Sequence, residues 1–502
     1  MNQAMATKTS PGVRWQLFLM MVLQIFIWGA WLPLIFSYLP GLKFKADKAP
    51  DALAFIPESI QWLFSEQSLI LNAFPVAAII GMFFSNQFAD RKFAAEKFLA
   101  FSHLIGGVCI LGLYFVTSFW PFFILMFVHC LFYVPTLSIT NSIAFANMKD
   151  PQNEFGPVRM GGTIGWIAAA WPFTFIFVDW EKVSAAKPEG FVNWLGTVLG
   201  SGLAGDSLQS ATKWTFVVAG VASLILAAFS LTLPHTPPKR VGEGGAEGLA
   251  WLEAVKLLKK PFVLVLWLVA FADSFVHNCY FSWTGTFLGT PVDQGGVGIP
   301  GNWIMPVMSV GQIAEILTMF VLGMTLRKLG WQATMMVGVL GHAARFAVYA
   351  FFPENWILIV LIQVLHGICY AFFFATVYIF VDAYFPKDVR NSAQGLFNVM
   401  ILGIGALVAY SVCPWLMQSV YTKVTPATEY STQEPVLANG PPRPRGEKLP
   451  PTITVPEKRE TDFKNLFLLP CMIATGAAFT LALFFNPPPV KPEEPEGGTG
   501  HP

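Results

Sequence analysis

The chain has 502 residues, of which 54% are hydrophobic and only 12% are charged. A soluble globular domain has about 25% charged residues, so this composition excludes a disordered chain and a water-exposed globular enzyme. The 31 Lys and Arg residues nearly balance the 30 Asp and Glu residues. The chain therefore has no strong positive charge for binding nucleic acid. We expect a protein that crosses a lipid bilayer many times.

Twelve stretches of the sequence are long and apolar enough to cross a bilayer core, which takes about 20 helical residues. The first lacks a small-residue cleavage site and is too long for a signal peptide, so we expect it to remain as a span. The fold class predicted is an all-α polytopic membrane protein with twelve transmembrane helices in two six-helix halves. The stretches lie at 14–40, 66–88, 98–117, 119–146, 159–180, 213–234, 261–288, 303–326, 331–352, 355–385, 391–420 and 465–486.

The positions of the basic residues predict the orientation of these spans. If the N-terminus lies inside, 17 of the 31 Lys and Arg residues fall in cytoplasmic segments, and the outer loops before the last hold only six. Cytoplasmic loops of membrane proteins carry an excess of Lys and Arg. We therefore expect both termini in the cytoplasm and the chain in the plasma (inner) membrane.

Changes in composition divide the chain into segments. Residues 1–234 are expected to form the N-terminal half, and 261–486 the C-terminal half. Between them, 235–260 is a cytoplasmic linker whose Gly/Pro-rich beginning is followed by a basic amphipathic helix. The segment 421–464 is rich in Pro, Thr and charge, which predicts a mostly disordered outer loop, and 487–502 is a disordered tail.

A short internal repeat supports the division into halves. His129 and Tyr133 on the fourth span match His366 and Tyr370 on the tenth, and a Val-Arg pair opens the next span in both places. Repeated halves are typical of transporters that bind their cargo between the halves, near the middle of the membrane.

The eighth span carries a carboxylate at Glu315 and an amide at Gln312, three residues earlier. Residues with this spacing face the same side of a helix. The pair can bind hydroxyls or the edge of a base, or it can form a hydrogen bond that holds helices together. A buried carboxylate can also exchange a proton, so Glu315 is the first candidate for proton coupling.

The fifth span opens with Arg159, Thr163 and Trp166 at positions i, i+4 and i+7. This spacing places a charge, a hydroxyl and an aromatic ring on one stripe of the helix, where they can contact a cargo. The alternative is that Arg159 is a positive-inside anchor and that the glycines between these residues only allow close helix packing.

Two further spans carry candidate site residues. On the tenth, the i,i+4 pair His366 and Tyr370 is a candidate for cargo binding. On the seventh, Asn278 is a candidate cargo ligand. Asp273 and His277 on that span either satisfy each other at i,i+4 or act as the second candidate for proton coupling.

Charged residues at the inner edge of the bundle are candidates for gating. Asp90 and Arg91 follow the second span, and Asp382 and Arg390 flank the loop after the tenth. Such charges can latch the two halves in one state and release them in another. Plain solvation of these charges is the alternative.

Motifs of enzymes and metal sites are absent from the sequence. It has no phosphate-binding loop, nucleophile elbow, zinc-protease motif or dinucleotide fingerprint. The six cysteines lie in apolar stretches and none forms C-x-x-C. We therefore expect no enzyme activity, metal site or cofactor, and transport that is passive or driven by an ion gradient.

Several stretches resemble the nucleoside:proton symporter family of the major facilitator superfamily. They are LQIFIWGAWLPLIFSYL, YVPTLSITNSIAF, VRMGGTIGWIAAAW, LTLPHTP, GQIAEIL, HAARFAVYAF and VRNSAQGLF. The resemblance implies twelve helices, alternating access and uptake of nucleosides with protons. It also implies a cargo site between the halves that uses Arg159, Thr163, Trp166, Gln312 and Glu315. The expected partners are a nucleoside, a proton and the bilayer, without nucleic acid, and the expected state is a monomer.

Two alternatives remain open at the level of sequence. One keeps the fold and carries a sugar or another polar metabolite, because Glu315 and Trp166 suit a sugar equally well. The other is a membrane sensor that has lost transport, since Ala371 stands where family members can have an acid.

Overall fold

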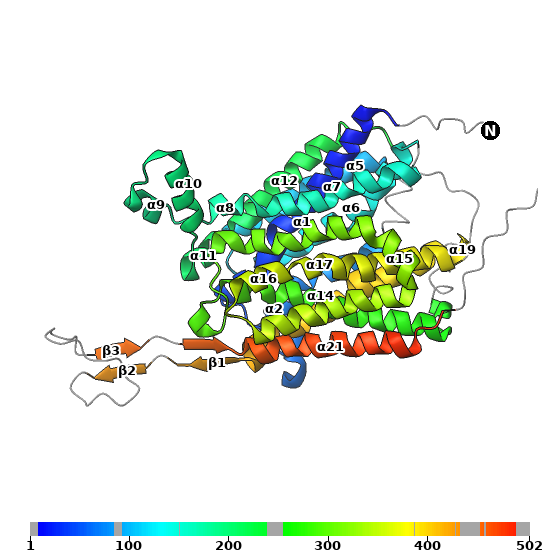
Figure 1. Ribbon diagram of the computed structural model, residues 1–502. Coiled ribbons are helices and arrows are strands. Elements are labelled where there is room, and N and C mark those ends of the chain that lie inside the picture. The colour runs from blue at the N-terminus through cyan, green and yellow to red at the C-terminus, as the bar shows by residue number, and fades with distance from the viewer. Residues whose placement is uncertain are drawn as a thin grey trace, which may run out of the picture.

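The structure is a computed structural model that describes most of the chain as a bundle of long helices. Figure 1 shows these helices running side by side, with residue 9 and the end of the last helix at the same end of the bundle. The described residues are 9–84, 93–149, 151–237, 255–385, 387–426, 428–431, 452–455 and 458–487.

The N-terminal half consists of long apolar helices joined by short helical segments. Its long helices are α1 (Pro11–Gly41), α3 (Ala73–Phe84), α5 (Ala95–Gly112), α6 (Phe119–Asn147), α7 (Pro151–Ala170) and α12 (Trp214–Ser230). Its short elements are η1 (Asp51–Leu53), η2 (Glu58–Phe64), α2 (Glu66–Leu71), η4 (Leu113–Phe115), α8 (Phe173–Ile176), α9 (Trp180–Ala186), α10 (Gly190–Gly200) and α11 (Gly205–Ala211).

The C-terminal half repeats this plan but contains three π-helical segments. Its helices are α14 (Pro261–Gly289), α15 (Gly301–Phe351), α16 (Trp356–Ile362), α17 (Val364–Cys369), α18 (Thr376–Tyr384), α19 (Lys387–Asn398), α20 (Gly405–Trp415) and α21 (Phe463–Phe484). The π-helical segments are η7 (Tyr370–Ala375), η8 (Val399–Ile404) and η9 (Leu416–Val420), and η6 (Val292–Gln294) is a 3₁₀ turn. Such segments are rare and are frequent at functional sites.

Each of the twelve predicted stretches contains a described helix. Within the described part of the chain, nine helices are long and apolar enough to cross a membrane, and a bent pair, Glu58–Leu71 with Ala73–Gly81, makes ten. One of the nine, the 51-residue α15, covers two predicted spans, which meet at Gly330. The remaining stretch lies on α7, which carries Glu154 and Arg159. The all-helical transporter fold is confirmed, while the number of twelve spans stays a prediction.

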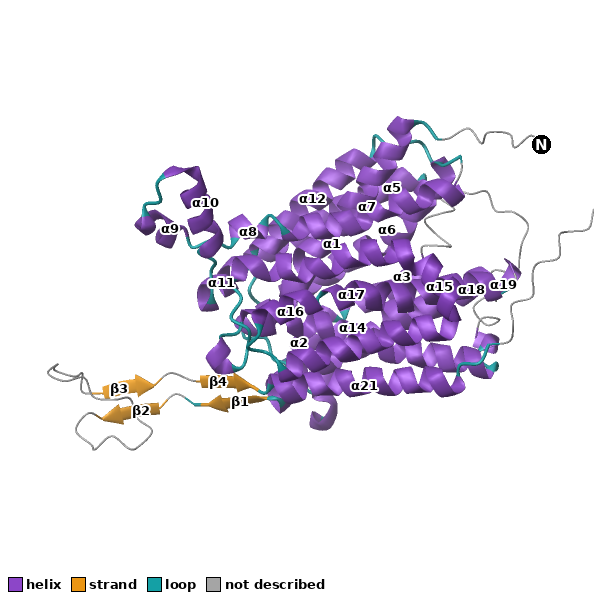
Figure 2. Ribbon diagram, viewed as in Figure 1, coloured by secondary structure: helices purple, strands orange, loops and turns teal. Residues whose placement is uncertain are grey.

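The segment 421–464, predicted as an outer loop, contains regular structure, so the expectation of mostly disorder is wrong for its described parts. Strand β1 (Thr422–Thr425) pairs antiparallel with β4 (Lys458–Thr461), and β2 (Thr428–Ser431) pairs with β3 (Thr452–Val455). The two pairs form an arm that projects from one end of the bundle in Figure 2. The β-branched Thr and Val residues in these segments favour strands. We call this end of the bundle the arm end.

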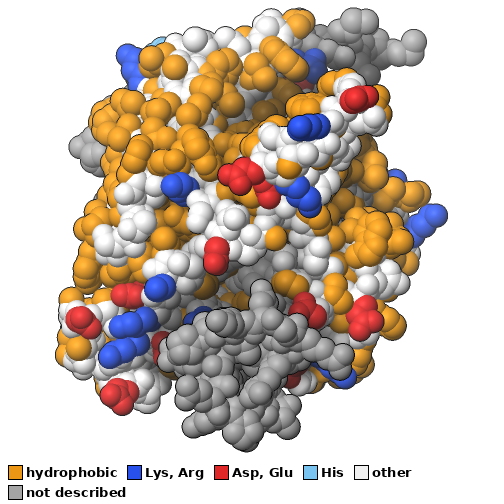
Figure 3. Space-filling view, turned by 90° about the vertical axis from the view of Figure 1, so that its left-hand side faces the viewer, with side chains coloured by type: hydrophobic (Ala, Val, Ile, Leu, Met, Phe, Trp, Pro, Cys, Tyr) orange, Lys and Arg blue, Asp and Glu red, His pale blue; other side chains and the backbone are white. Residues whose placement is uncertain are grey.

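Apolar and charged side chains are separated on the surface. Figure 3 views the molecule from the arm end: charged side chains are scattered over this face, and hydrophobic side chains gather toward its rim. Exposed apolar side chains such as Phe101 (54% exposed), Leu317 (64%) and Phe479 (64%) lie along the helices. This distribution suits a protein whose flanks face lipid and whose ends face water.

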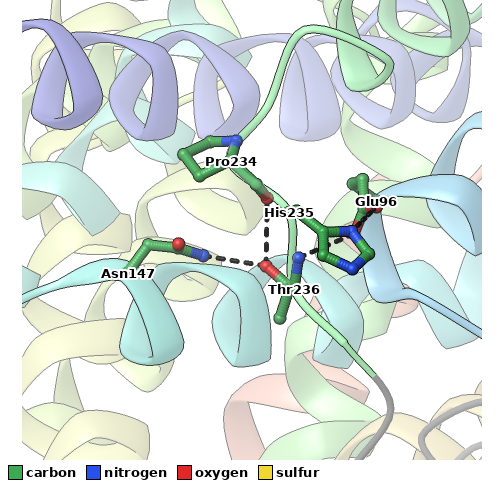
Figure 4. Close-up of polar contacts among 5 residues, drawn as sticks. All are labelled: Glu96, Asn147, Pro234, His235 and Thr236. Atoms are coloured by element: carbon green, nitrogen blue, oxygen red, sulfur yellow. Dashed lines mark hydrogen bonds and ion pairs between the residues drawn. The ribbon is translucent and has the colours of Figure 1, made fainter.

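The chain leaves the N-terminal half through a hydrogen-bonded anchor, shown in Figure 4. The backbone N–H of Thr236 donates to Glu96 Oε2 at 3.0 Å, and His235 Nδ1 lies 2.8 Å from Glu96 Oε1. The Asn147 amide donates to the Thr236 hydroxyl at 2.8 Å. These contacts hold the start of the linker against α5 and α6. The first half of the predicted amphipathic helix, and the predicted tail after residue 487, lie outside the described residues.

Candidate functional site

The polar stripe of α7 faces the second half of the bundle. Thr163 Oγ1 lies 3.5 Å from Glu315 Oε1 on α15, so two candidates from opposite halves are brought together. Arg159, one turn before Thr163, is close enough for its charge to act on the Glu315 carboxyl. The contact joins a hydroxyl, a cation and a carboxylate where the two halves meet.

Close packing of α7 on α1 fixes the direction of this stripe. A Cβ at Gly165 would lie 2.8 Å from the carbonyl carbon of Val22, which is backbone, so the helices touch there without intervening side chains. On the other side of the same contact, the Trp166 Cα lies 3.2 Å from the position of a Cβ at Gly29. Only glycine allows helices to approach this closely.

Trp166 forms an aromatic wall with residues of both halves. Its ring lies edge-on to Trp28 at 5.5 Å and edge-on to Phe281 of α14 at 5.7 Å. Trp28 in turn stacks on Phe74 at 4.6 Å. Edge-to-face and stacked rings at these distances are favourable, and they leave flat apolar surface beside the polar stripe.

Gln312 and Glu315 occupy the same stretch of α15, as their spacing predicts. Gln312 is 5% exposed, and its amide oxygen has no hydrogen-bond partner within the described residues. A buried polar atom usually has a partner, so this oxygen is a free acceptor. Tyr370 lies within electrostatic range of both Glu315 and Arg159. The predicted residues Arg159, Thr163, Gln312, Glu315 and Tyr370 therefore surround one region between the halves.

Asn278 lies on α14, three residues before Phe281, and has local hydrogen bonds. Its side-chain N–H donates to the Ser274 carbonyl at 2.8 Å, and its own carbonyl accepts a hydrogen bond from Ser282 at 2.9 Å. It is 8% exposed. Its side-chain oxygen is the group left for a cargo, and its place as a cargo ligand stays a prediction.

The alternative in which Asp273 and His277 satisfy each other is wrong. Neither carboxylate oxygen of Asp273 has a hydrogen-bond partner among the described residues, and its Oδ2 lies 3.7 Å from Nε2 of His342. His277 instead stacks on the His366 ring at 5.0 Å. The i,i+4 spacing did not predict these contacts because the partners lie on other helices. His342 belongs to α15 and His366 to α17.

His366 is hydrogen-bonded to Arg345, a partner that the sequence did not predict. Its Nδ1 accepts a hydrogen bond from Arg345 at 2.9 Å, and the ring is 2% exposed. Arg345 lies inside the stretch 331–352 that is predicted to cross the membrane. His366 therefore faces Arg345, while Tyr370, four residues on, lies within electrostatic range of Glu315.

The predicted gating charges lie partly outside the description. Asp90, Arg91 and the side chain of Arg390 lie outside the described part of the structure, and Asp382 is exposed at the end of α18. Their gating role stays a prediction.

A different set of residues joins the two halves at the arm end, which the charge distribution predicts to be the outer end, and we call it the outer contact. Gln67 of α2 and Gln418 of η9 exchange two amide hydrogen bonds at 2.8 and 3.0 Å. The Asn72 amide donates to the Ser411 hydroxyl at 2.7 Å. Trp62 stacks on Trp415 at 4.7 Å. In the sequence, these residues stand out only as single Gln and Asn residues within apolar stretches. No spacing rule indicates that they contact each other.

Two helical halves with polar groups opposed between them and joined at one end define a secondary transporter of the major facilitator architecture. Comparison with known proteins identifies the family. The profile described as nucleoside H+ symporter matches residues 12–203 and 190–439. The chain belongs to this family.

Individual relatives agree with this assignment. YegT of Escherichia coli (strain K12), which carries a provisional nucleoside-transporter name, is 27% identical over 411 residues, 81% of this chain and 85% of YegT. Nucleoside permease NupG of the same organism is 25% identical over 417 residues, 79% of this chain and 86% of NupG. A crystal structure of a NupG mutant covers 94% of this chain and 100% of its own, with a TM-score of 0.70 at 22% identity. This last likeness shows the fold.

Proposed function

We propose that this protein imports nucleosides together with protons by alternating access. The family is that of nucleoside H+ symporters. The observation that carries the proposal is the contact between Thr163 and Glu315, which brings the polar groups of α7 and α15 together between the halves. A cargo bound there touches both halves at once, so its affinity depends on how they are arranged.

The chemistry of the region suits a planar base attached to a polyhydroxylated sugar. The flat surface of Trp166 offers stacking to a base. The free amide oxygen of Gln312 accepts a hydrogen bond from an amino group or a hydroxyl. Glu315 accepts hydrogen bonds from ribose hydroxyls, and Arg159 donates to oxygens of the base or sugar.

Orientation follows from the charge distribution together with the fold. We place the protein in the inner membrane, with both termini in the cytoplasm. The arm end, with the outer contact, then faces the outside of the cell. The described chain ends lie at the same end of the bundle (Figure 1), in support of this placement. The protein acts as a monomer, since the opposed groups all come from one chain.

Transport into proteoliposomes tests the proposal. Purified protein is reconstituted, loaded with unlabelled cargo and offered radiolabelled nucleosides or sugars, and exchange is measured without a gradient and then with an inward pH gradient. We expect exchange of nucleosides in the wild type, loss of exchange in Glu315→Ala, and normal exchange in Glu354→Gln, an exposed acid far along the chain.

The possible outcomes separate the candidate functions. Exchange of sugars without nucleosides would replace the cargo, and absence of any exchange by folded wild-type protein would favour the sensor interpretation. Exchange of nucleosides that is indifferent to a pH gradient would remove the proton from the proposal.

A further inference from the structure

A fully buried cation lies in the C-terminal half, behind the proposed nucleoside site. Arg345 of α15 is 0% exposed. Its Nη1 lies 2.9 Å from Nδ1 of His366, and its Nη2 lies 2.9 Å from Nδ1 of His342. Its guanidinium also stands 4.1 Å above the ring of Tyr280. A buried charge is costly unless it is balanced, so the identity of its counter-charge matters.

Hydrogen-bond chemistry fixes the state of both histidines. An arginine side chain can only donate, so both Nδ1 atoms must accept, and both imidazoles are neutral with their hydrogen on Nε2. The Nε2 of His342 faces Asp273 Oδ2 at 3.7 Å. The opposite charge nearest to this group of side chains is therefore the carboxylate of Asp273, reached through the His342 ring.

Asp273 is the member of the group that has room for a proton. It is 0% exposed, and neither of its oxygens has a hydrogen-bond partner within the described residues. His342 Nε2 is likewise without a hydrogen bond there. Both nitrogens of Arg345 that reach a histidine are already engaged. Among Asp273, His342, Arg345 and His366, the free acceptor for an arriving proton is therefore Asp273, while the neighbouring His277 has an Nδ1 that also lacks a partner there.

Other titratable groups face these residues from the helices packed around them. The His277 ring stacks on His366 at 5.0 Å and lies edge-on to His342 at 5.8 Å. Tyr280 and Tyr349 are both hydrogen-bonded to Gln363, at 3.0 and 2.7 Å. The remaining group is the Cys369 thiol, which lies within electrostatic range of Arg345 and Asp273. None of these is a carboxylate, so Asp273 is the acid that faces Arg345 here, among the described residues.

Direct packing connects this group to the proposed nucleoside site. A Cβ at Gly311, the residue before Gln312, would lie 2.8 Å from Cβ of His366. The His366 ring is edge-on to Phe281 at 5.6 Å, and Phe281 is edge-on to Trp166 at 5.7 Å. A shift of His366 therefore presses on the helix that carries Gln312 and on the aromatic wall.

We propose that Asp273, His342, Arg345 and His366 form the proton-binding site of this transporter, which we call the Arg345 cluster. One proton from the aqueous side adds to a carboxylate oxygen of Asp273, forming one O–H bond and breaking none within the protein. The cluster then changes from neutral to a net charge of +1, and Arg345 loses its counter-charge. The histidines that Arg345 holds transmit this change to α17 and to the nucleoside site. Glu315 is then a cargo ligand and not the coupling group.

The inference rests on the proposed function, and its test separates the two. Asp273→Asn keeps the shape of the side chain but cannot bind the proton. In proteoliposomes, we expect this variant to exchange labelled nucleoside at a rate within about twofold of the wild type. Accumulation driven by a pH gradient should fall by at least about tenfold. Asp293→Asn, the same change at an exposed position, should leave both unchanged.

The outcomes that overturn the inference are distinct from those that overturn the function. If the wild type exchanges nucleoside and Asp273→Asn still accumulates it with an undiminished proton requirement, the Arg345 cluster is not the coupling site. If the wild type exchanges no nucleoside, the proposed function itself fails.

A second variant covers the case in which Asp273→Asn does not fold. Asp273→Glu keeps the acid but moves it by one methylene. We expect it to accumulate nucleoside with a pH profile displaced from that of the wild type. A merely structural aspartate would leave the midpoint of the profile in place, and an undisplaced midpoint would refute the proposal.

Discussion

The sharpest structural prediction concerns Gly367, where α17 crosses α15 directly behind Glu315. A Cβ at this glycine would lie 2.5 Å from the carbonyl carbon of Ala314 and 2.7 Å from Cα of Glu315. Both are backbone atoms, so no side chain can turn away to make room. Ordinary contact begins near 3.4 Å, and the backbone nitrogen of Glu315 lies closer still than these two atoms. Gly367→Ala therefore requires the two helices to separate by more than about 0.9 Å.

The size of the effect follows from this separation. Forcing one extra carbon into a well-packed interior typically costs about 1–3 kcal/mol. Because the strain falls on the backbone that carries Glu315, it acts on the site as well as on stability. Displacing a binding group by about 1 Å can reduce function by about 100-fold. We expect a clear loss of thermal stability and a fall in nucleoside affinity of at least about tenfold.

The measurement is thermal unfolding of the purified protein, with and without nucleoside, together with a binding isotherm. The matched control is Gly476→Ala on α21, where a Cβ would meet nothing within 4 Å. That change should be neutral or slightly stabilising, because alanine favours helix over glycine by about 1 kcal/mol. If Gly367→Ala behaves like the control in both measurements, the close approach of α17 to the site helix is refuted.

Three further predictions test the site, the outer contact and the topology. Gln312→Ala should weaken nucleoside binding by about 1–3 kcal/mol by leaving a buried cargo donor without its acceptor, and unchanged affinity in a binding assay would remove Gln312 from the site. Gln418→Ala should break both hydrogen bonds to Gln67 and favour the state open at the arm end by about 1–3 kcal/mol; faster labelling of a site cysteine from outside would show this, and equal rates would contradict it. A cysteine at Ser431 should react with an impermeant reagent on intact cells and one at Glu243 should not, whereas the reverse pattern would invert the topology.

The sequence predicts the helices of this protein well because their signal is local. Each apolar stretch is long enough to cross the bilayer, and as a helix it satisfies its backbone hydrogen bonds within itself. A membrane-spanning segment needs both properties. The break in α15 is an example: the two spans expected at 303–326 and 331–352 meet at Gly330, whose φ of 74° favours glycine. The strands β1 to β4 were missed because Pro and charge dominate their surroundings, although Thr and Val occupy the strands themselves.

Site residues were predictable where they share one helix. Arg159, Thr163 and Trp166 lie on one stripe of α7, and Gln312 and Glu315 on one stretch of α15, as their spacing requires. The contact of Thr163 with Glu315 joins residues 152 positions apart, and only the family resemblance suggested it.

The Arg345 cluster shows what spacing alone cannot supply and what an inventory of charge can. Asp273 and His277 have the spacing of an i,i+4 pair. In the structure, however, Asp273 faces His342, and His366 accepts a hydrogen bond from Arg345. Spacing along one helix cannot show that a side chain will pair with a residue of another helix instead of with a residue one turn away. The requirement that buried charges balance is not local, however. Arg345 is the one arginine deep within a predicted span of the C-terminal half. The acids in those spans are Asp273, Glu315 and Asp382, and Asp382 stands at a helix end. Since Glu315 already faces Arg159, charge balance alone would have paired Arg345 with Asp273, and this reasoning extends to any membrane chain with few buried charges.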